Sequence, residues 1–154
     1  MNVSQAEKDE TIKGGEIISK MLAAEGVETV FGIVDSSIST LCASLKSSGI
    51  KLISPTHETN AMHMAGAYAR ITGHLGVCIA GKGPGLANAL SGVAVENAEG
   101  HRVLLISGAA EGGNPDHDPK GAYRYLPQLD ATRPITKWNG TVSSLEKISK
   151  TMCK

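Results

Sequence analysis

Apolar positions along the chain follow two spacings, one typical of buried strands and one typical of helices. Short apolar runs rich in β-branched residues occur at 28–34, 50–53, 75–80 and 102–107. Their continuity predicts strands that are buried on both faces. Between them, apolar side chains recur every three or four residues, which predicts amphipathic helices. The helices are expected from Ile12 to Leu22, from a cap at Ser36 or Ser37 to Gly49, at 57–72 and at 84–98.

Strands that alternate with helices indicate repeated βαβ units. The sequence therefore predicts an α/β fold, a three-layer doubly wound sheet that is mainly parallel and has helices on both faces. The pattern weakens after Gly108. We expect a loop at 109–121, a short strand at 135–139 and an amphipathic helix at 143–152, while residues 1–12 are expected to form a flexible N-terminal arm.

Composition narrows the function classes without naming one. The 154 residues, with a mass of 16.0 kDa, suit one domain. Lysine and arginine total 15, equal to the 15 acidic residues, so neither a nucleic-acid binder nor a protein of anionic membranes is expected. The 3 cysteines are scattered and odd in number, which favours a reducing, cytoplasmic compartment. No apolar run approaches the roughly 20 residues of a membrane helix.

Three motifs are weighed and set aside. Residues 76–83 resemble a phosphate-binding P-loop, but Gly83 stands where Ser or Thr should bind Mg²⁺, and the intervening residues are expected to form a strand. His57 and His63 are too far apart for the paired histidines of a zinc helix. The acidic residues around His117 are interpreted as a solvated turn. No metal site is expected within the chain.

Two features are candidates for function because each follows the end of a predicted strand, where ligands bind in parallel sheets. Glu58 opens a helix. It either complements the helix dipole there or exchanges a proton with a ligand nitrogen. The segment 81–88 (GKGPGLAN) is either a tight turn or a surface that a flat ligand can approach closely, since glycine has no side chain in the way.

In combination, these segments resemble the N-terminal pyrimidine-binding (Pyr) domain of thiamine-diphosphate enzymes. The superfamily includes acetolactate synthase, oxalyl-CoA decarboxylase and sulfoacetaldehyde acetyltransferase. Four blocks carry the resemblance, in family order: EGVETVFG at 25–32, residues 57–70, residues 76–88, and TRPITKW at 132–138. The turn after the first strand, Val34–Ser37, and Arg124 depart from the family pattern.

The resemblance implies roles for particular residues. Glu58 would be catalytic: its counterpart hydrogen-bonds N1′ of the cofactor aminopyrimidine and favours the imino tautomer, which takes the proton from C2 of the thiazolium. Gly83, Pro84 and Gly85 would lie against the pyrimidine, and Asn88 would brace the helix beyond. The implied function is a lyase or acyltransferase acting on 2-oxo acids or acyl-CoA.

The resemblance also implies a partner. In such enzymes a second domain (PP), marked by a Gly-Asp-Gly that this sequence lacks, holds the diphosphate through Mg²⁺. We expect residues 13–154 to form a Pyr-type domain without its last strand, inactive alone. The PP domain would be on the same parent chain or a separate subunit, in a homodimer or hetero-oligomer. The alternative is a non-catalytic module for dimerisation or regulation, and a flavodoxin-like nucleotide binder ranks last.

Overall fold

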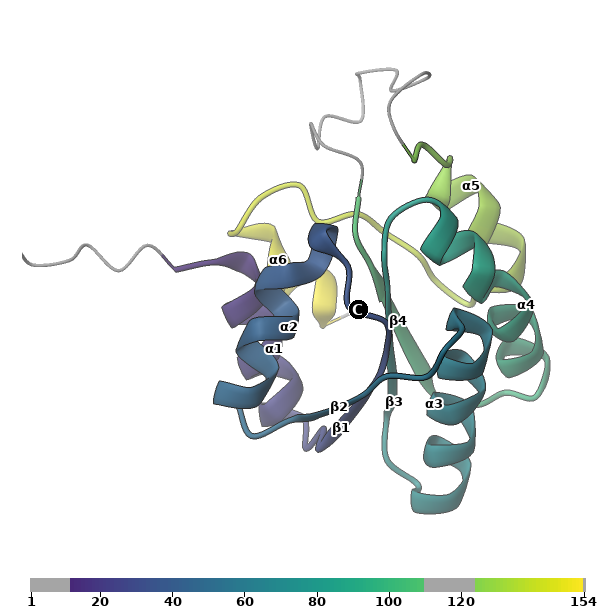
Figure 1. Ribbon diagram of the computed structural model, residues 1–154, viewed down its shortest axis with the longest axis horizontal. Coiled ribbons are helices and arrows are strands. Elements are labelled where there is room, and N and C mark those ends of the chain that lie inside the picture. The colour runs from purple at the N-terminus through teal and green to yellow at the C-terminus, as the bar shows by residue number, and fades with distance from the viewer. Residues whose placement is uncertain (1–11, 110–123, 154) are drawn as a thin grey trace, which may run out of the picture.

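The computed structural model describes residues 12–109 and 124–153. Helices and strands alternate from the N-terminus to the last strand, as the apolar spacing predicts (Figure 1). The elements are α1 (Gly14–Ala24), β1 (Thr29–Gly32), the 3₁₀ helix η1 (Ser36–Ile38), α2 (Ser39–Ser47), β2 (Lys51–Ile53), α3 (Glu58–Thr72), β3 (Gly76–Ala80), α4 (Pro84–Ala98), β4 (Val103–Ser107), α5 (Gln128–Thr132), the 3₁₀ helix η2 (Arg133–Ile135) and α6 (Lys147–Met152).

The strands form a four-stranded sheet in the order β2-β1-β3-β4, and each neighbouring pair is parallel. Helix α2 connects β1 to β2, and α3 then connects β2 back to β3 on the other side of β1. Because crossovers between parallel strands are right-handed, this reversal puts α2 and α3 on opposite faces. The predicted doubly wound α/β fold is thereby confirmed, with helices on both faces (Figure 1).

Alternate residues of the two central strands face opposite sides of the sheet. Val30 and Val77 belong to an apolar cluster with α1 and α2. The next residues along the strands, Phe31 and Cys78, belong to a second cluster with α3 and α4. Since both sides of the sheet are covered, β3 is buried along its whole length, which explains why its sequence is a continuous apolar run.

Helices α3 and α4 pack against each other through small residues. Ala61 and Ala65 of α3 and Ala89 of α4 have an exposed fraction of 0%. A Cβ atom at Gly92 would lie 2.5 Å from the Cβ of Met62, so a side chain has no room there. This core therefore needs few aromatic residues, because the two backbones themselves come close together.

The carboxylate of Glu96 is buried near the C-terminal end of α4. Its Oε1 lies 2.8 Å from Nδ1 of His63, and its Oε2 lies 2.6 Å from Nδ1 of His101. A buried carboxylate without such partners would strongly destabilise the fold. Motif spacing alone gave these two histidines no role. In the structure, their contacts with Glu96 hold α3, α4 and the start of β4 together.

The prediction of a strand at 135–139 is wrong. The 3₁₀ helix η2 ends at Ile135, and residues 136–143 have no regular structure. Pro134 lacks the N–H that a sheet ladder needs. The Asn139 side chain instead donates to the backbone carbonyl of Leu129, at 2.9 Å, and caps α5. Helix α5 itself was not expected, because its 5 residues are too few to show a helical period.

The helix expected at 143–152 is shorter, with α6 confined to Lys147–Met152. Ile148 is 2% exposed and packs near Gly14 of α1. Since α5 contacts α4 and α6 contacts α1, the chain passes from one face of the sheet to the other between them (Figure 1). The predicted arm up to residue 11 and the predicted loop from residue 110, with its acidic turn around His117, lie outside the described residues.

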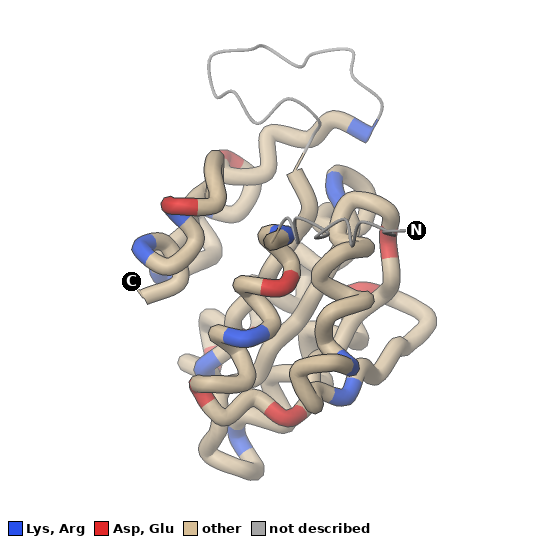
Figure 2. The backbone as a smooth tube through the Cα atoms, turned by 90° about the vertical axis from the view of Figure 1, so that its left-hand side faces the viewer, with Lys and Arg blue, Asp and Glu red and all other residues tan. Residues whose placement is uncertain are grey.

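Charged residues of both signs are interspersed along the described chain (Figure 2), in keeping with the equal numbers of acidic and basic residues in the sequence. Among the described helices, none is long and apolar enough to cross a membrane.

The close approach of α3 and α4 leads to a prediction for Gly92→Ala. In an exposed helix this change stabilises by about 0.5–1 kcal/mol. Here the added methyl meets Met62, and overpacking should lower the free energy of unfolding by about 1–3 kcal/mol. Urea denaturation measures the change. The control Asn97→Ala, on the exposed side of α4, should stay within about 0.5 kcal/mol of the unmodified chain; an equal loss in both variants would contradict the packing argument.

Candidate functional site

The candidate site lies where β1 and β3 end. These adjacent strands connect onward in opposite directions, β1 to β2 on one side and β3 to β4 on the other. In open α/β sheets the crevice at this switch point, outside the carboxyl ends of the strands, is the usual ligand site. The N-terminal ends of α2, α3 and α4 follow strands and so open at this same edge.

Glu58 is the first residue of α3, but it does not cap the helix. The N-cap is His57, whose Nδ1 accepts a hydrogen bond from the backbone N–H of Thr59 at 3.2 Å. Oε2 of Glu58 instead accepts a hydrogen bond from Nδ2 of Asn88, at 3.0 Å. The Thr59 hydroxyl also donates to the backbone carbonyl of Asn88, so the first turns of α3 and α4 are tied together around the carboxylate.

The three glycines at positions 81, 83 and 85 make room for different neighbouring residues. Gly83 has a φ of +61°, which favours glycine, and a Cβ there would meet the backbone carbonyl of Arg124. A Cβ at Gly81 would meet the side chain of Asp35. Only at Gly85 would a Cβ face Glu58, 3.3 Å from its Oε1. Of the three glycines, Gly85 is therefore the one whose missing side chain leaves space beside the candidate carboxylate.

A polar network joins the turns that follow β1 and β3. Asp35 caps η1 by accepting from the backbone N–H of Ser37 at 2.9 Å and from its hydroxyl at 2.6 Å. The Ser37 hydroxyl in turn accepts from the backbone N–H of Lys82, at 3.2 Å. Arg124 pairs with Asp35 at 2.7 Å. The Ser37 hydroxyl and N–H, together with the Arg124 guanidinium, hold the pKa of Asp35 at about 2 against the opposing effect of burial.

Cys78 lies in β3, near Glu58. Burial, together with the negative charge of Glu58, raises the pKa of the Cys78 thiol to about 12. Because the thiolate is the reactive form of cysteine, this thiol is inert near neutral pH.

The structure brings together some of the residues that the sequence singled out and separates others. Glu58, Gly85 and Asn88 meet at one place. Gly83 lies against Arg124 instead, and Pro84 is exposed in the first turn of α4. The network of Asp35 and Arg124 was missed. Its one local signal is an Asp before two serines, since Asp is a common N-cap, whereas the cap expected from the sequence was Ser36 or Ser37.

The comparisons with known proteins decide the family. The family described as thiamine pyrophosphate enzyme, N-terminal TPP binding domain, matches residues 12–127. The chain belongs to this thiamine pyrophosphate enzyme family. The resemblance noted in the sequence is thus confirmed. The matching domain of the family is its N-terminal, TPP-binding domain.

Individual proteins of known name also have sequences similar to this chain. The chain is 34% identical over 140 residues to 2-hydroxyacyl-CoA lyase 1 of Homo sapiens, covering 91% of this chain and 24% of that protein. It is also 34% identical over 137 residues to the catabolic acetolactate synthase of Raoultella terrigena, covering 89% of this chain and 24% of that protein. The chain therefore spans about a quarter of the length of these relatives.

The described residues fit the part of a thiamine diphosphate site that holds the aminopyrimidine. The Glu58 carboxylate, fixed by Asn88 next to the open side of Gly85, suits a ring nitrogen that needs a hydrogen-bond partner. Mg²⁺ needs several oxygen ligands. Within residues 12–109 and 124–153, no group of three or more His, Cys, Asp or Glu side chains could hold a metal ion.

The network around Asp35 predicts a pH dependence. Because its pKa in the folded chain lies below the ordinary value of 3.8, Asp35 stabilises the fold fully above about pH 4, and this contribution is lost as the pH falls toward 2. Asp35→Asn should therefore lower stability near neutral pH, and its difference from the unmodified chain should shrink through that window. Thermal unfolding followed from pH 2 to 7 measures this.

Asp130→Asn is the matched control for Asp35→Asn. Asp130 is 77% exposed, and its carboxylate lies 3.5 Å from the Arg133 guanidinium. Such an exposed ion pair contributes little, so removing the charge of Asp130 should change the stability little at any pH. A constant stability difference between Asp35→Asn and the unmodified chain across the acid range would contradict the proposed network.

Proposed function

We propose that this domain is the pyrimidine-binding half of a thiamine-diphosphate-dependent lyase or acyltransferase, with Glu58 as its catalytic residue. The observation that supports this most is the position of Glu58 at the switch point of the sheet, with one oxygen held by Asn88. When bound, thiamine diphosphate supplies a thiazolium that stabilises a carbanion. Glu58 would hold a proton at N1′ of the aminopyrimidine.

The two oxygens of Glu58 have different surroundings. Oε2 accepts the hydrogen bond from Asn88. Oε1 has no hydrogen bond within the described residues and faces the side of Gly85 that lacks a side chain. A carboxyl group with one oxygen fixed and the other open can present a single, oriented partner to a ligand nitrogen. Gly83, Pro84 and Gly85 would form the backbone surface beside the ring.

The remaining parts of the reaction would come from a PP domain, on the same parent chain or a separate subunit. That domain would hold the diphosphate through Mg²⁺, in a homodimer or hetero-oligomer. The names of the relatives, 2-hydroxyacyl-CoA lyase and acetolactate synthase, support acyl-CoA or 2-oxo-acid substrates. The compartment proposed from the three unpaired cysteines is the cytoplasm.

A second candidate function is a non-catalytic Pyr-type module for dimerisation or regulation. It is favoured by the outer face of α4, where the exposed residues are mostly small: Ala87, Ser91, Val95 and Ala98 recur every three or four positions. A helix with such a face can approach another helix closely. Glu58 would then have no chemical role.

Proton exchange tests the catalytic proposal. The chain is combined with a PP-domain protein of the family, thiamine diphosphate and Mg²⁺, and exchange of the C2 proton for deuterium is followed by NMR. Glu58→Gln should slow exchange by about 100-fold or more, in the range of acid–base catalysis. The control Glu99→Gln, exposed after the end of α4, should exchange like the unmodified chain. Equal exchange by Glu58→Gln, with partner binding in calorimetry that thiamine diphosphate does not strengthen, would favour the non-catalytic module.

A further inference from the structure

Thr59, the residue after Glu58, contacts helix α4 through both its side chain and its backbone. Its hydroxyl donates to the backbone carbonyl of Asn88 and lies 3.0 Å from the hydroxyl of Ser91. Its own backbone carbonyl lies against Gly92, where a Cβ atom would come within 3.2 Å of it. These contacts, spread along one turn of α4, fix that helix relative to the start of α3.

The direction of the two hydroxyl hydrogen bonds follows from the groups involved. A carbonyl oxygen only accepts, so the single proton of the Thr59 hydroxyl goes to Asn88. The Ser91 hydroxyl then donates to Thr59. Valine has the same branched shape as threonine but no hydroxyl, so Thr59→Val removes both hydrogen bonds and keeps the methyl group in place.

The Asn88 side chain needs such support because it is exposed. An exposed amide can exchange a protein partner for water at little cost in free energy. Its hydrogen bond to Oε2 of Glu58, at 3.0 Å, therefore depends on how well the two groups are placed beforehand. Thr59 provides this placement, since its hydroxyl is bonded to the backbone of Asn88 itself.

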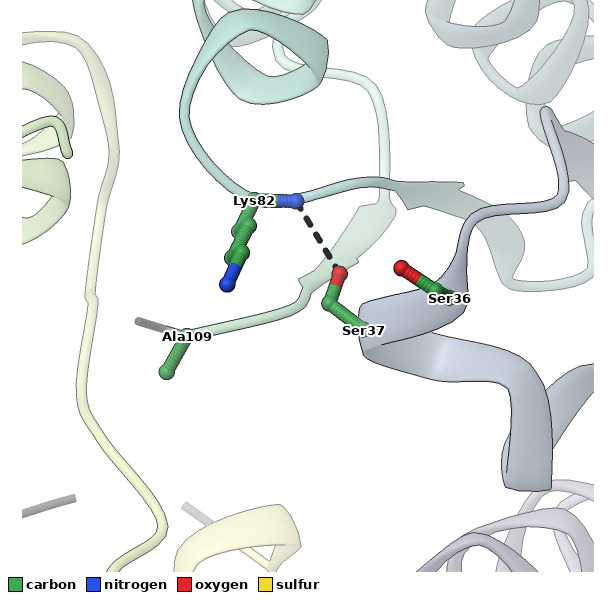
Figure 3. A pocket seen from close by; sticks show the side chains of 4 residues that line it. All are labelled: Ser36, Ser37, Lys82 and Ala109. Atoms are coloured by element: carbon green, nitrogen blue, oxygen red, sulfur yellow. Dashed lines mark hydrogen bonds between the residues drawn. The ribbon is translucent and has the colours of Figure 1, made fainter. Parts of the chain in front are cut away.

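A second hydroxyl ties the same part of the chain from the other side of the sheet. The Ser37 hydroxyl of η1 accepts from the backbone N–H of Lys82, at 3.2 Å (Figure 3). That hydrogen bond precedes Gly83, and the conformational freedom of glycine separates it from α4. It fixes the turn before the helix, whereas the hydroxyl of Thr59 fixes the helix at Asn88.

We propose that Thr59 is a positioning residue, which holds Asn88 against Glu58 and so orients the Glu58 carboxylate toward the cofactor aminopyrimidine. Thr59 acts through Asn88 and does not itself contact the ligand. The orientation toward the aminopyrimidine rests on the proposed function, whereas the hold on Asn88 does not.

Amide NMR of the ¹⁵N-labelled 154-residue chain, without cofactor or partner, tests the hold on Asn88. The side-chain amide signals of Asn88 are identified by their loss in Asn88→Ala. In Thr59→Val, these signals should move toward the shifts of free asparagine, and their protons should exchange with water about fivefold faster, the effect of one hydrogen bond. Thr59→Ser keeps the hydroxyl and should restore the original signals.

Thr72→Val is the matched control. Its hydroxyl also donates to a backbone carbonyl, that of Tyr68, but at the other end of α3. This variant should leave the Asn88 signals unchanged. Unchanged Asn88 signals in Thr59→Val, or equal changes in Thr59→Val and Thr72→Val, would overturn the proposal.

Exchange of the C2 proton, measured with a PP-domain protein, thiamine diphosphate and Mg²⁺, tests the link to the carboxylate. Thr59→Val should slow exchange by about tenfold, less than Glu58→Gln, because the carboxyl group remains but is less well oriented. Thr59→Ser should exchange like the unmodified chain. If Glu58→Gln slows exchange and Thr59→Val does not, the link from Thr59 to the carboxylate is wrong. If Glu58→Gln has no effect, the proposed function fails, and the Asn88 signals alone decide the role of Thr59.

Discussion

The close approach of helices α3 and α4 is the constraint on which the candidate site depends. Ala65, Ala89 and Gly92 let the two backbones come together, and the first turns then meet in register. That register brings Asn88 within 3.0 Å of Glu58, and of the two glycines of the Gly-Pro-Gly turn it is Gly85 that faces the carboxylate. Larger residues at the contact would separate the helices, and Glu58 would lose the partner that orients it.

The carboxylates at the two ends of the same helix pair have different surroundings. At the C-terminal end of α4, both oxygens of Glu96 have histidine partners, so that carboxylate is fully used within the fold. At the N-terminal end, Glu58 has one oxygen bound and one open among the described residues. Glu58 is only half-buried, so its open oxygen is accessible, and this is the feature that supports a ligand at Glu58.

Much of the fold could be predicted because it depends on residues that are close together in the sequence. Strand β3 is a continuous apolar run that is followed by Gly81. Gly73 ends α3 with a left-handed φ of +75°. What could not be predicted depends on partners far apart in the chain. Asp35 and Arg124 lie 89 residues apart in number, and neither position indicates the other. The short strand expected at 135–139 failed for a related reason, since Asn139 is engaged by Leu129 and not by a strand.

The sequence resemblance placed Gly83, Pro84 and Gly85 together beside the ligand of Glu58, and it did not distinguish the tasks of the individual glycines. Glycine in a turn can make room for a ligand or for the protein itself, and sequence does not distinguish these cases. The structure does: Gly81 and Gly83 make room for Asp35 and Arg124, and Gly85 makes room beside Glu58. The turn after β3 thus makes room for two sets of neighbours: the side chain of Asp35 and the backbone of Arg124, and the carboxylate of Glu58, which has one open oxygen among the described residues.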